Sequence, residues 1–398
     1  MELLDLPAEI RNHIYSLLLE PSANRTTTQD KHTYYHFSQI LGLFSVNKQV
    51  RAEALPIFHS LNQFIVIDTP WADAETHVHI EGQVPVVVPG GRAAEFTTWT
   101  LLARIHAPDV GLIEGVQKFV LHIDDLPAFC NTWRYSDLSH PGLNPLLYLE
   151  LELRDPSAKS WDEPRIPKAL QQRLLLPFGI VKELRSVKFT GDVTAVKSVV
   201  DEMKKRMAEP HESPESCLRR ATAMKDAGNT ALREKKYDDA LECYRKAWLA
   251  MHIVVNGRKR HIHGDMWFNR ELKEEPFKGM QGHTVRLALR VKLVANTVQL
   301  YLLMERFEDA QYWGMRTIGM IRSAIGLGEN EEAERPEDEA IRNFMSDDVG
   351  KIYFRTAMAW KALNDMYEAR KLLKVAQVYL PNDRRVREEV TASAPRVL

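Results

Sequence analysis

Residues 221–254 read ATAMKDAGNTALREKKYDDALECYRKAWLAMHIV, and this stretch decides the fold of the second half of the chain. Small and aromatic residues recur in it at helical spacing: Gly228, Ala231, Tyr237, Ala240, Tyr244 and Ala247. Small residues let two antiparallel helices approach closely, and aromatic rings fill the space that remains between them. The stretch therefore predicts a pair of packed helices.

The same arrangement returns twice further along the chain, which indicates a repeat architecture. In a 34-residue frame it begins again at Val291 and at Gly350, and places Tyr301, Phe307, Ala310, Ala357, Trp360, Ala369 and Pro381. The second copy is degenerate, with Val298, Gly314 and Thr317 at positions that are usually small, aromatic and small. We predict repeats over about 221–254, 291–324 and 350–383, with insertions between them and a capping helix over 382–390.

This frame resembles the tetratricopeptide repeat, and residues 217–392 resemble the repeat domains of co-chaperones and large immunophilins. Those domains hold the acidic C-terminal tail of the seventy- and ninety-kilodalton heat-shock chaperones in a two-carboxylate clamp. The matching positions in this chain are Lys225, Asn229, Asn296, Lys351 and Arg355. The resemblance implies an all-α solenoid whose concave groove takes an acidic peptide with a free terminal carboxylate.

The residue types agree with that chemistry. Lys225 and Asn229, like Lys351 and Arg355, are spaced i,i+4, so each pair lies on one face of its helix. Asn offers neutral N–H donors, Lys a mobile charge and Arg a planar fork, which together suit two carboxylates. A single lysine on a helix is usually a solvated residue. Here all five residues match the clamp in type and position, and the repeat frame was set by the small and aromatic residues alone, which favours the clamp. The assignment of Asn296 to the clamp depends on the register of the degenerate second repeat.

The insertion before the third repeat, residues 325–349, departs from the family. It includes Glu329-Asn330-Glu331-Glu332-Ala333-Glu334. We interpret it as a solvated loop, and the alternative is an acidic segment that competes with the peptide for the clamp.

The first 60 residues form a helical segment that resembles F-box-like proteins of filamentous fungi. The resemblance rests on Leu6-Pro7-Ala8-Glu9-Ile10 and on residues 46–58, VNKQVRAEALPIF. It implies that Leu6, Pro7 and Ile10 dock on the linker subunit of a cullin-type ubiquitin ligase. The alternative is that Ile10, Ile14, Leu17 and Leu18, which share one helical face, anchor the helix to the layer that follows.

Residues 61–207 predict a mixed α/β or leucine-rich-repeat-like domain. Strands are expected at 64–67, 119–123, 147–154 and 184–189, and helices at 97–105 and 166–176. The polar segment 208–216 is the predicted linker. The fold class is thus α+β and multidomain: F-box-like helices with an α/β layer, then a helical repeat domain.

Composition and charge exclude several functions. Residues 217–398 carry 32 Lys and Arg against 26 Asp and Glu, which suits an acidic peptide but is far from a nucleic-acid-binding stripe. The three cysteines do not have the spacing of metal ligands, so we expect reduced thiols. Reduced thiols predict a protein of the cytoplasm or, alternatively, the nucleus. The longest apolar runs are too short to span a bilayer. We expect no cofactor, no metal and no enzymatic activity, with an activity in residues 61–207 as the remaining alternative.

Overall fold

The computed structural model describes residues 3–28, 32–108, 117–159, 161–324 and 339–393. The chain forms two compact units, Met1–His211 and Glu212–Leu398. In the part of the chain that is described, no helix has the length and apolar character needed to cross a membrane.

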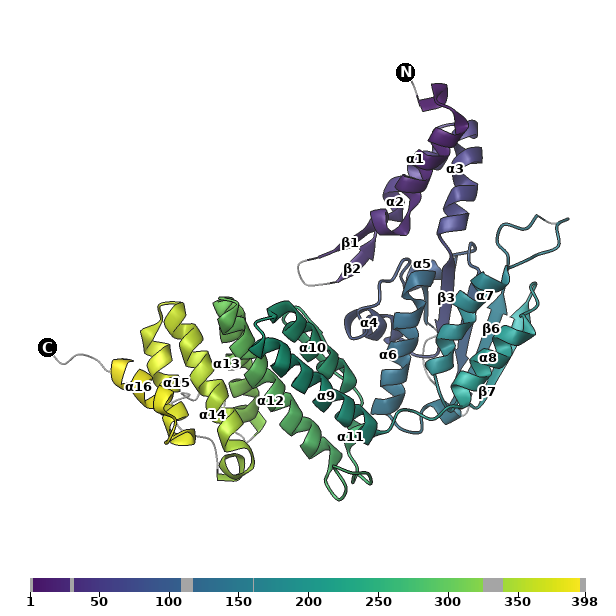
Figure 1. Cartoon of the computed structure of the whole chain (residues 1–398). Helices are drawn as coiled ribbons and strands as arrows, with labels where there is room; N and C mark the ends of the chain where they lie inside the picture. Colours follow the sequence, from purple (N-terminus) through teal and green to yellow (C-terminus); the bar gives the residue numbers. More distant parts are fainter. Residues whose placement is uncertain (1–2, 29–31, 109–116, 160, 325–338, 394–398) are drawn as a thin grey trace. The chain divides into compact units, whose positions relative to one another are not determined.

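The first unit begins with two long helices, α1 (Ala8–Leu19) and α3 (Lys48–Leu61), which pack together (Figure 1). Between them lie a small hairpin, β1 (Arg25–Thr27) with β2 (Thr33–Tyr35), and the short helix α2 (Phe37–Ile40). Asn47 starts α3 by accepting a hydrogen bond from the Val50 amide at 2.8 Å, a standard N-cap.

Helix α1 buries a different face from the one the apolar pattern predicts. Arg11, Tyr15 and Leu19 are buried, whereas Ile10, Leu17 and Leu18 are 49%, 55% and 49% exposed. The buried set is shifted by one residue, or about 100° around the helix. Arg11 binds Glu53 of α3 at 2.5 Å, and this bond lowers the pKa of Glu53 to about 2. The anchoring role predicted for Ile10, Leu17 and Leu18 is therefore wrong, because an ion pair and a tyrosine occupy the interface.

A five-stranded mixed sheet forms the centre of the first unit. Its order is β5 (Gln117–His122), β3 (Phe64–Thr69), β4 (Leu101–His106), β6 (Tyr148–Leu153) and β7 (Ser186–Gly191). The β3–β4 and β6–β7 pairs are parallel, and β3–β5 and β4–β6 are antiparallel, unlike the all-parallel sheet of leucine-rich repeats. The helix predicted at 97–105 is wrong, since Leu101–His106 is the central strand.

Both faces of this sheet are covered, which explains that error. Ile65 and Ile67 pack on one side with α6 (Leu126–Ser139), α7 (Lys168–Leu175) and α8 (Lys197–Ala208). Phe64 and Val66 pack on the other side with residues of α1 and α3. A strand buried on both faces reads as a continuous apolar run, which sequence periodicity cannot distinguish from a buried helix segment. The short helices α4 (Ala74–Ile80) and α5 (Gly90–Ala93) follow β3.

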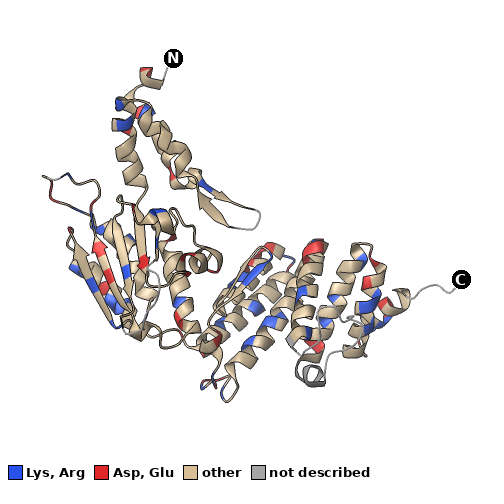
Figure 2. Cartoon of the chain, turned by 180° about the vertical axis from the view of Figure 1, so that it is seen from behind, with Lys and Arg blue, Asp and Glu red and all other residues tan. Residues whose placement is uncertain are grey.

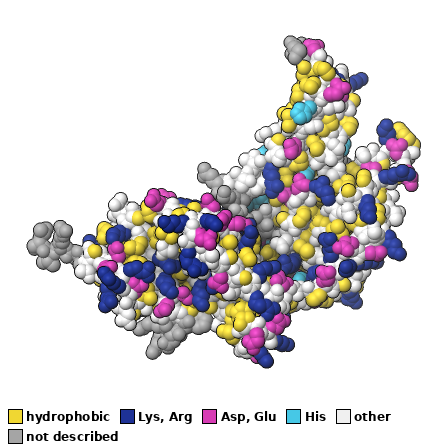
Figure 3. All heavy atoms as spheres, in the orientation of Figure 1, with side chains coloured by type: hydrophobic (Ala, Val, Ile, Leu, Met, Phe, Trp, Pro, Cys, Tyr) yellow, Lys and Arg dark blue, Asp and Glu magenta, His cyan; other side chains and the backbone are white. Residues whose placement is uncertain are grey.

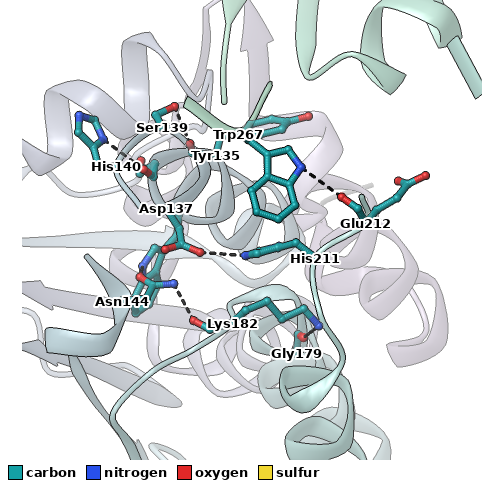
Figure 4. A network of polar contacts seen from close by, with 12 residues as sticks. Tyr135, Asp137, Ser139, His140, Asn144, Gly179, Lys182, His211, Glu212 and Trp267 are labelled. Atoms are coloured by element: carbon teal, nitrogen blue, oxygen red, sulfur yellow. Dashed lines mark hydrogen bonds and ion pairs between the residues drawn. The ribbon is translucent and has the colours of Figure 1, made fainter. Parts of the chain in front are cut away.

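A buried ion pair holds the end of the first unit (Figure 4). His211 Nε2 lies 2.9 Å from Asp137 Oδ2 of α6, and both side chains are 6% exposed. Nearby, Asn144 accepts a hydrogen bond from Trp133 and donates one to the Lys182 carbonyl. Residue 211 of the predicted linker is therefore packed rather than extended into solvent.

His122 makes the stability of the first unit sensitive to pH. Burial lowers its pKa from 6.5 to about 4, against the opposing effect of Asp124. The unfolded chain then binds the proton more tightly, so stability is complete above pH 6.5 and is lost as the pH falls towards 4. The contribution of His122 to the free energy of unfolding is about 3 kcal/mol.

We expect His122→Phe, which keeps an aromatic ring beside Phe64, to flatten this pH dependence of stability in calorimetry between pH 7.5 and 4.5. His106→Phe, on an exposed side chain, is the control, and an unchanged slope in His122→Phe would contradict the assignment.

The second unit consists of helix pairs arranged in chain order (Figure 1). The pairs are α9 (Pro214–Arg233) with α10 (Tyr237–Ala250), α12 (Gly282–Leu303) with α13 (Phe307–Ala324), and α14 (Glu339–Ala362) with α15 (Met366–Tyr379). Helix α16 (Arg384–Ser393) packs on α15. An unpredicted hairpin, β8 (Ile253–Asn256) with β9 (Lys259–Ile262), and the short helix α11 (Asp265–Phe268) follow the first pair.

All three pairs turn in the same way. Lys235, Glu305 and Asn364 have φ values of 60°, 58° and 66°, and their spacings of 70 and 59 residues equal those of the repeat starts. The amide of the next residue bonds the carbonyl five residues before it in each case, at 2.9 Å, as in a Schellman motif. The turns of the backbone therefore recur at the same two spacings as the small and aromatic residues.

Candidate functional site

The five residues of the expected clamp lie on α9, α12 and α14, the first helices of the three pairs. Helix α12 packs against both α9 and α14, so it lies between them. Lys225 and Asn229 are on α9, Asn296 is on α12, and Lys351 and Arg355 are on α14. Each of the five side chains is partly accessible.

Asn229 and Asn296 are in direct contact. Asn229 Oδ1 accepts hydrogen bonds from Asn296 Nδ2 at 2.7 Å and from the Tyr244 hydroxyl at 2.8 Å. Burial raises the pKa of Tyr244 to about 12, so its hydroxyl remains a donor. Two bonds to the oxygen fix the Asn229 amide and leave its N–H groups for a ligand. Sequence reasoning identified Tyr244 only as a packing residue and missed this orienting role.

Arg355 adds a charge next to this pair. Its Nη1 donates to the carbonyl of Ala295, the residue before Asn296, at 2.6 Å. Burial, and then the nearby Arg385, lowers the pKa of Arg355 to about 10. Among the described residues no carboxylate forms an ion pair with this guanidinium. A largely buried arginine without a counter-ion is the feature expected of an anion site.

The two lysines lie one helical turn before the asparagine and the arginine and have acidic neighbours. Lys225 Nζ is 3.0 Å from Asp226 Oδ1, and Lys351 Nζ is 3.7 Å from Asp348 Oδ1. Lys351 is the looser pair, and its side chain is 42% exposed. Both ammonium groups are long and rotatable, so each can exchange its neighbour for a ligand carboxylate.

The structure thus brings Asn229, Asn296 and Arg355 into one cluster, with Lys225 and Lys351 on the same helical faces. Lys and Arg side chains are frequent on the face of this unit that Figure 3 shows. Two asparagine amides and three cations can hold two carboxylates on neighbouring atoms. No protein-family model, no curated protein and no solved structure matches the chain. Function must therefore be inferred from this arrangement of residues.

The acidic segment Glu329–Glu334 lies outside the described residues, so its position relative to the cluster is not part of the structure. The described end of the insertion belongs to α14, which is kinked at Met345.

The F-box-like residues lie at the start of the first unit. Pro7 precedes α1 and is exposed, and Leu6 accepts a hydrogen bond from Arg11 through its carbonyl. Ile10 is on the exposed face of α1 with Leu17 and Leu18. Figure 3 shows hydrophobic side chains exposed along this part of the chain.

The sheet unit contains an apolar cavity of about 410 Å³ between α4 and α6. Its walls include Trp71, Phe129 and Trp133, and His77 Nε2 lies 3.1 Å from Ser136 Oγ at its edge. Ser136 Oγ also contacts the Thr132 carbonyl, the usual i−4 bond of a helical serine. Among the described residues no group of three or more His, Cys, Asp and Glu could hold a metal. An activity in residues 61–207 would need a cavity such as this one.

Proposed function

We propose that residues 217–392 form a tetratricopeptide-repeat domain that binds the acidic C-terminal tail of a heat-shock chaperone, and that the chain is a non-enzymatic adaptor. Two hydrogen bonds carry this proposal: Asn296 bonds Asn229, and Arg355 bonds the carbonyl of Ala295, the residue before Asn296, so that polar residues from three helices come together. The three helix pairs have the same turn, which supports the repeat frame that gives the positions of these residues.

The chemistry of the cluster selects a C-terminal carboxylate. Buried charged hydrogen bonds contribute about 1.5–3 kcal/mol each, and the aspartate at the end of such a tail offers two carboxylates. Asn229 and Asn296 supply donors without adding repulsion between cations. Arg355, already desolvated and without a counter-ion, gains more from an anion than an exposed arginine would.

Titration of the full chain with an acidic pentapeptide tests the proposal. We expect micromolar affinity, about −8 kcal/mol, which weakens as salt is added. Amidation of the terminal carboxylate should cost at least about tenfold, and Lys351→Glu about 30-fold, because one charge is removed and a repulsive one is introduced. Calorimetry of the free-acid and amidated peptides makes the comparison.

Lys246→Glu provides the matched control. Lys246 is on α10, is similarly exposed, and is 3.7 Å from Glu242, so the charge change is the same at a place outside the cluster. Equal affinity for the free-acid and amidated peptides, or equal losses in the two lysine variants, would exclude the clamp.

A second function is favoured by the exposed face of α1. We propose it as an F-box-type docking surface for the linker subunit of a cullin ubiquitin ligase, with the repeats selecting the client. Its apolar residues Ile10, Leu17 and Leu18 are exposed, as are Leu3 and Leu4 in the short 3-10 helix Leu3–Asp5 before it. The two functions are compatible, since a chaperone-bound client could be marked for degradation.

We expect Ile10→Asp to remove co-purification of the linker subunit from cell extract without lowering the melting temperature. The reason is that Ile10 is about half exposed and supports no internal packing. Ile80→Asp, at a side chain 45% exposed in the same unit, is the control. Co-purification of the subunit with Ile10→Asp at the wild-type level would exclude this surface.

A further inference from the structure

A second basic site lies outside the clamp. A cavity of about 250 Å³ is bounded by α10, α12, α13 and the β8–β9 hairpin. Figure 2 shows this hairpin beside the helices, and its basic residues are on strand β9. The clamp residues come from α9, α12 and α14, and the cavity shares with them helix α12 and Tyr244, which orients Asn229. Four arginines and one carboxylate line this cavity: Arg245, Arg258, Arg260, Arg306 and Asp309.

Arg260 of β9 is held between two tryptophans. Its guanidinium carbon is 4.7 Å from the ring centre of Trp248 on α10 and 4.6 Å from that of Trp313 on α13. Both rings lie within cation–π distance of the guanidinium, an interaction that uses its charge and not its N–H groups. The two rings stabilise the charge of the Arg260 guanidinium but accept no hydrogen bond from its N–H groups.

The Arg260 donors have no acceptor in the described part of the chain. Its Nε is buried without a hydrogen-bond partner, and no carboxylate forms an ion pair with it. Burial, then Arg290 and Arg316, lowers its pKa to about 9. Arg290 Nε is likewise buried without a partner. Arg290 and Arg316 thus repel the charge of Arg260, and none of the described carboxylates pairs with Arg260, which is costly unless an anion binds there.

The other arginines of the wall are compensated, and this contrast marks Arg260. Asp309 binds Arg306 at 2.7 Å and lies 3.5 Å from Arg258. Arg245 is paired with Glu242 at 2.7 Å. Only Arg260, the most enclosed of the four, lacks such a partner among the described residues.

We propose that this cavity binds a phosphate monoester, with the edge of Arg260 holding the phosphate and the aromatic walls holding the organic group that carries it. A phosphate dianion balances more of the clustered charge than a carboxylate does, and its oxygens match the guanidinium fork. Trp248, Trp313 and Tyr301 provide the apolar surface for the remainder of the ligand. The volume suits one phosphorylated side chain or a small organic phosphate. Arg260 and its two tryptophans are not clamp residues, although Tyr244, which orients Asn229, also lines this cavity.

Titration of the full chain with phenyl phosphate, monitored by calorimetry and by melting temperature, tests the proposal. We expect saturable binding and a raised melting temperature, with inorganic phosphate and benzoate each at least tenfold weaker. A phosphotyrosine peptide that binds more tightly than phenyl phosphate would identify a phosphorylated protein as the source of the group. Weaker binding of that peptide would identify a small molecule.

Arg260→Met should reduce the affinity for phenyl phosphate at least tenfold, whereas Arg384→Met, an exposed arginine of α16, should not change it. Arg306→Met, on the exposed side of the cavity, gives a second reading if Arg260→Met does not fold, with an expected loss of at least threefold. No binding of phenyl phosphate to the wild-type chain, equal binding of benzoate, or unchanged affinity in the folded cavity variants would overturn the proposal.

Discussion

Arg355→Met is expected to weaken binding of the acidic C-terminal peptide about 100-fold while the helical unit stays folded. The arginine fork would lose two charged hydrogen bonds to the ligand, together worth about 3 kcal/mol. In the free protein the same change removes a largely buried charge that has no carboxylate partner, and such a replacement is often neutral for stability. The single bond lost is the one to the Ala295 carbonyl.

Arg385→Met is the matched control for this variant. Arg385 is near enough to lower the pKa of Arg355, but its side chain is 73% exposed and pairs with Asp383 at 3.0 Å. We expect its loss to change peptide affinity by no more than about threefold, as for an exposed, screened charge. Calorimetric titration and a melting curve of each variant measure both effects. Similar affinities for wild type and Arg355→Met would show that Arg355 does not contact the peptide.

Gly228→Ala should destabilise the second unit by about 1–3 kcal/mol, because the helices there are too close for a methyl group. A Cβ at this position would lie 2.5 Å from the Tyr244 ring, and Tyr244 is 1% exposed. The overlap outweighs the gain of about 1 kcal/mol that alanine normally brings to a helix. Movement of the ring would also break its hydroxyl bond to Asn229, so peptide affinity should fall with stability.

Gly319→Ala tests the same substitution without the overlap. Gly319 is in α13, and a Cβ there would meet nothing within 4 Å. We expect it to stabilise the unit by about 0.5–1 kcal/mol, the ordinary difference between the two residues in a helix. Chemical denaturation of both variants should give opposite signs. A stabilised Gly228→Ala would mean that α9 and α10 are further apart than the structure shows.

The fold could be predicted best where its signal is local. The small and aromatic residues of α9 and α10 predicted a helix pair, and the structure has one at that place. The strand at 147–154 also follows from its alternation, because one side of β6 is less buried than the other. The strand at 101–106 was missed, since it begins with the apolar run Leu101–Ala103, buried on both faces, and alternates only in its last residues.

The candidate sites divide in the same manner. The sequence positions of Asn229, Asn296 and Arg355 followed from the repeat frame, because an i,i+4 spacing within a helix is a local property. The contact of Asn229 with Tyr244 and with Asn296 needed coordinates. Arg260 gave no signal in the sequence that distinguished it from other arginines. Its two tryptophans are 12 residues before it and 53 after it, and only folding brings them to its faces.

The sequence by itself determined the helix pairs of the second half and the residues expected to line their groove. Helical spacing and turn geometry depend on neighbours within a few residues, so they are legible in a linear pattern. The tertiary structure alone decided which face of α1 is buried, where Arg11 and Glu53 replace the expected apolar contact. It also decided which charges form no ion pair with a described carboxylate, as at Arg260 and Arg355. Both outcomes depend on residues that are far apart in the chain. Burial removes water from the charged groups, so the presence or absence of a partner then changes the free energy.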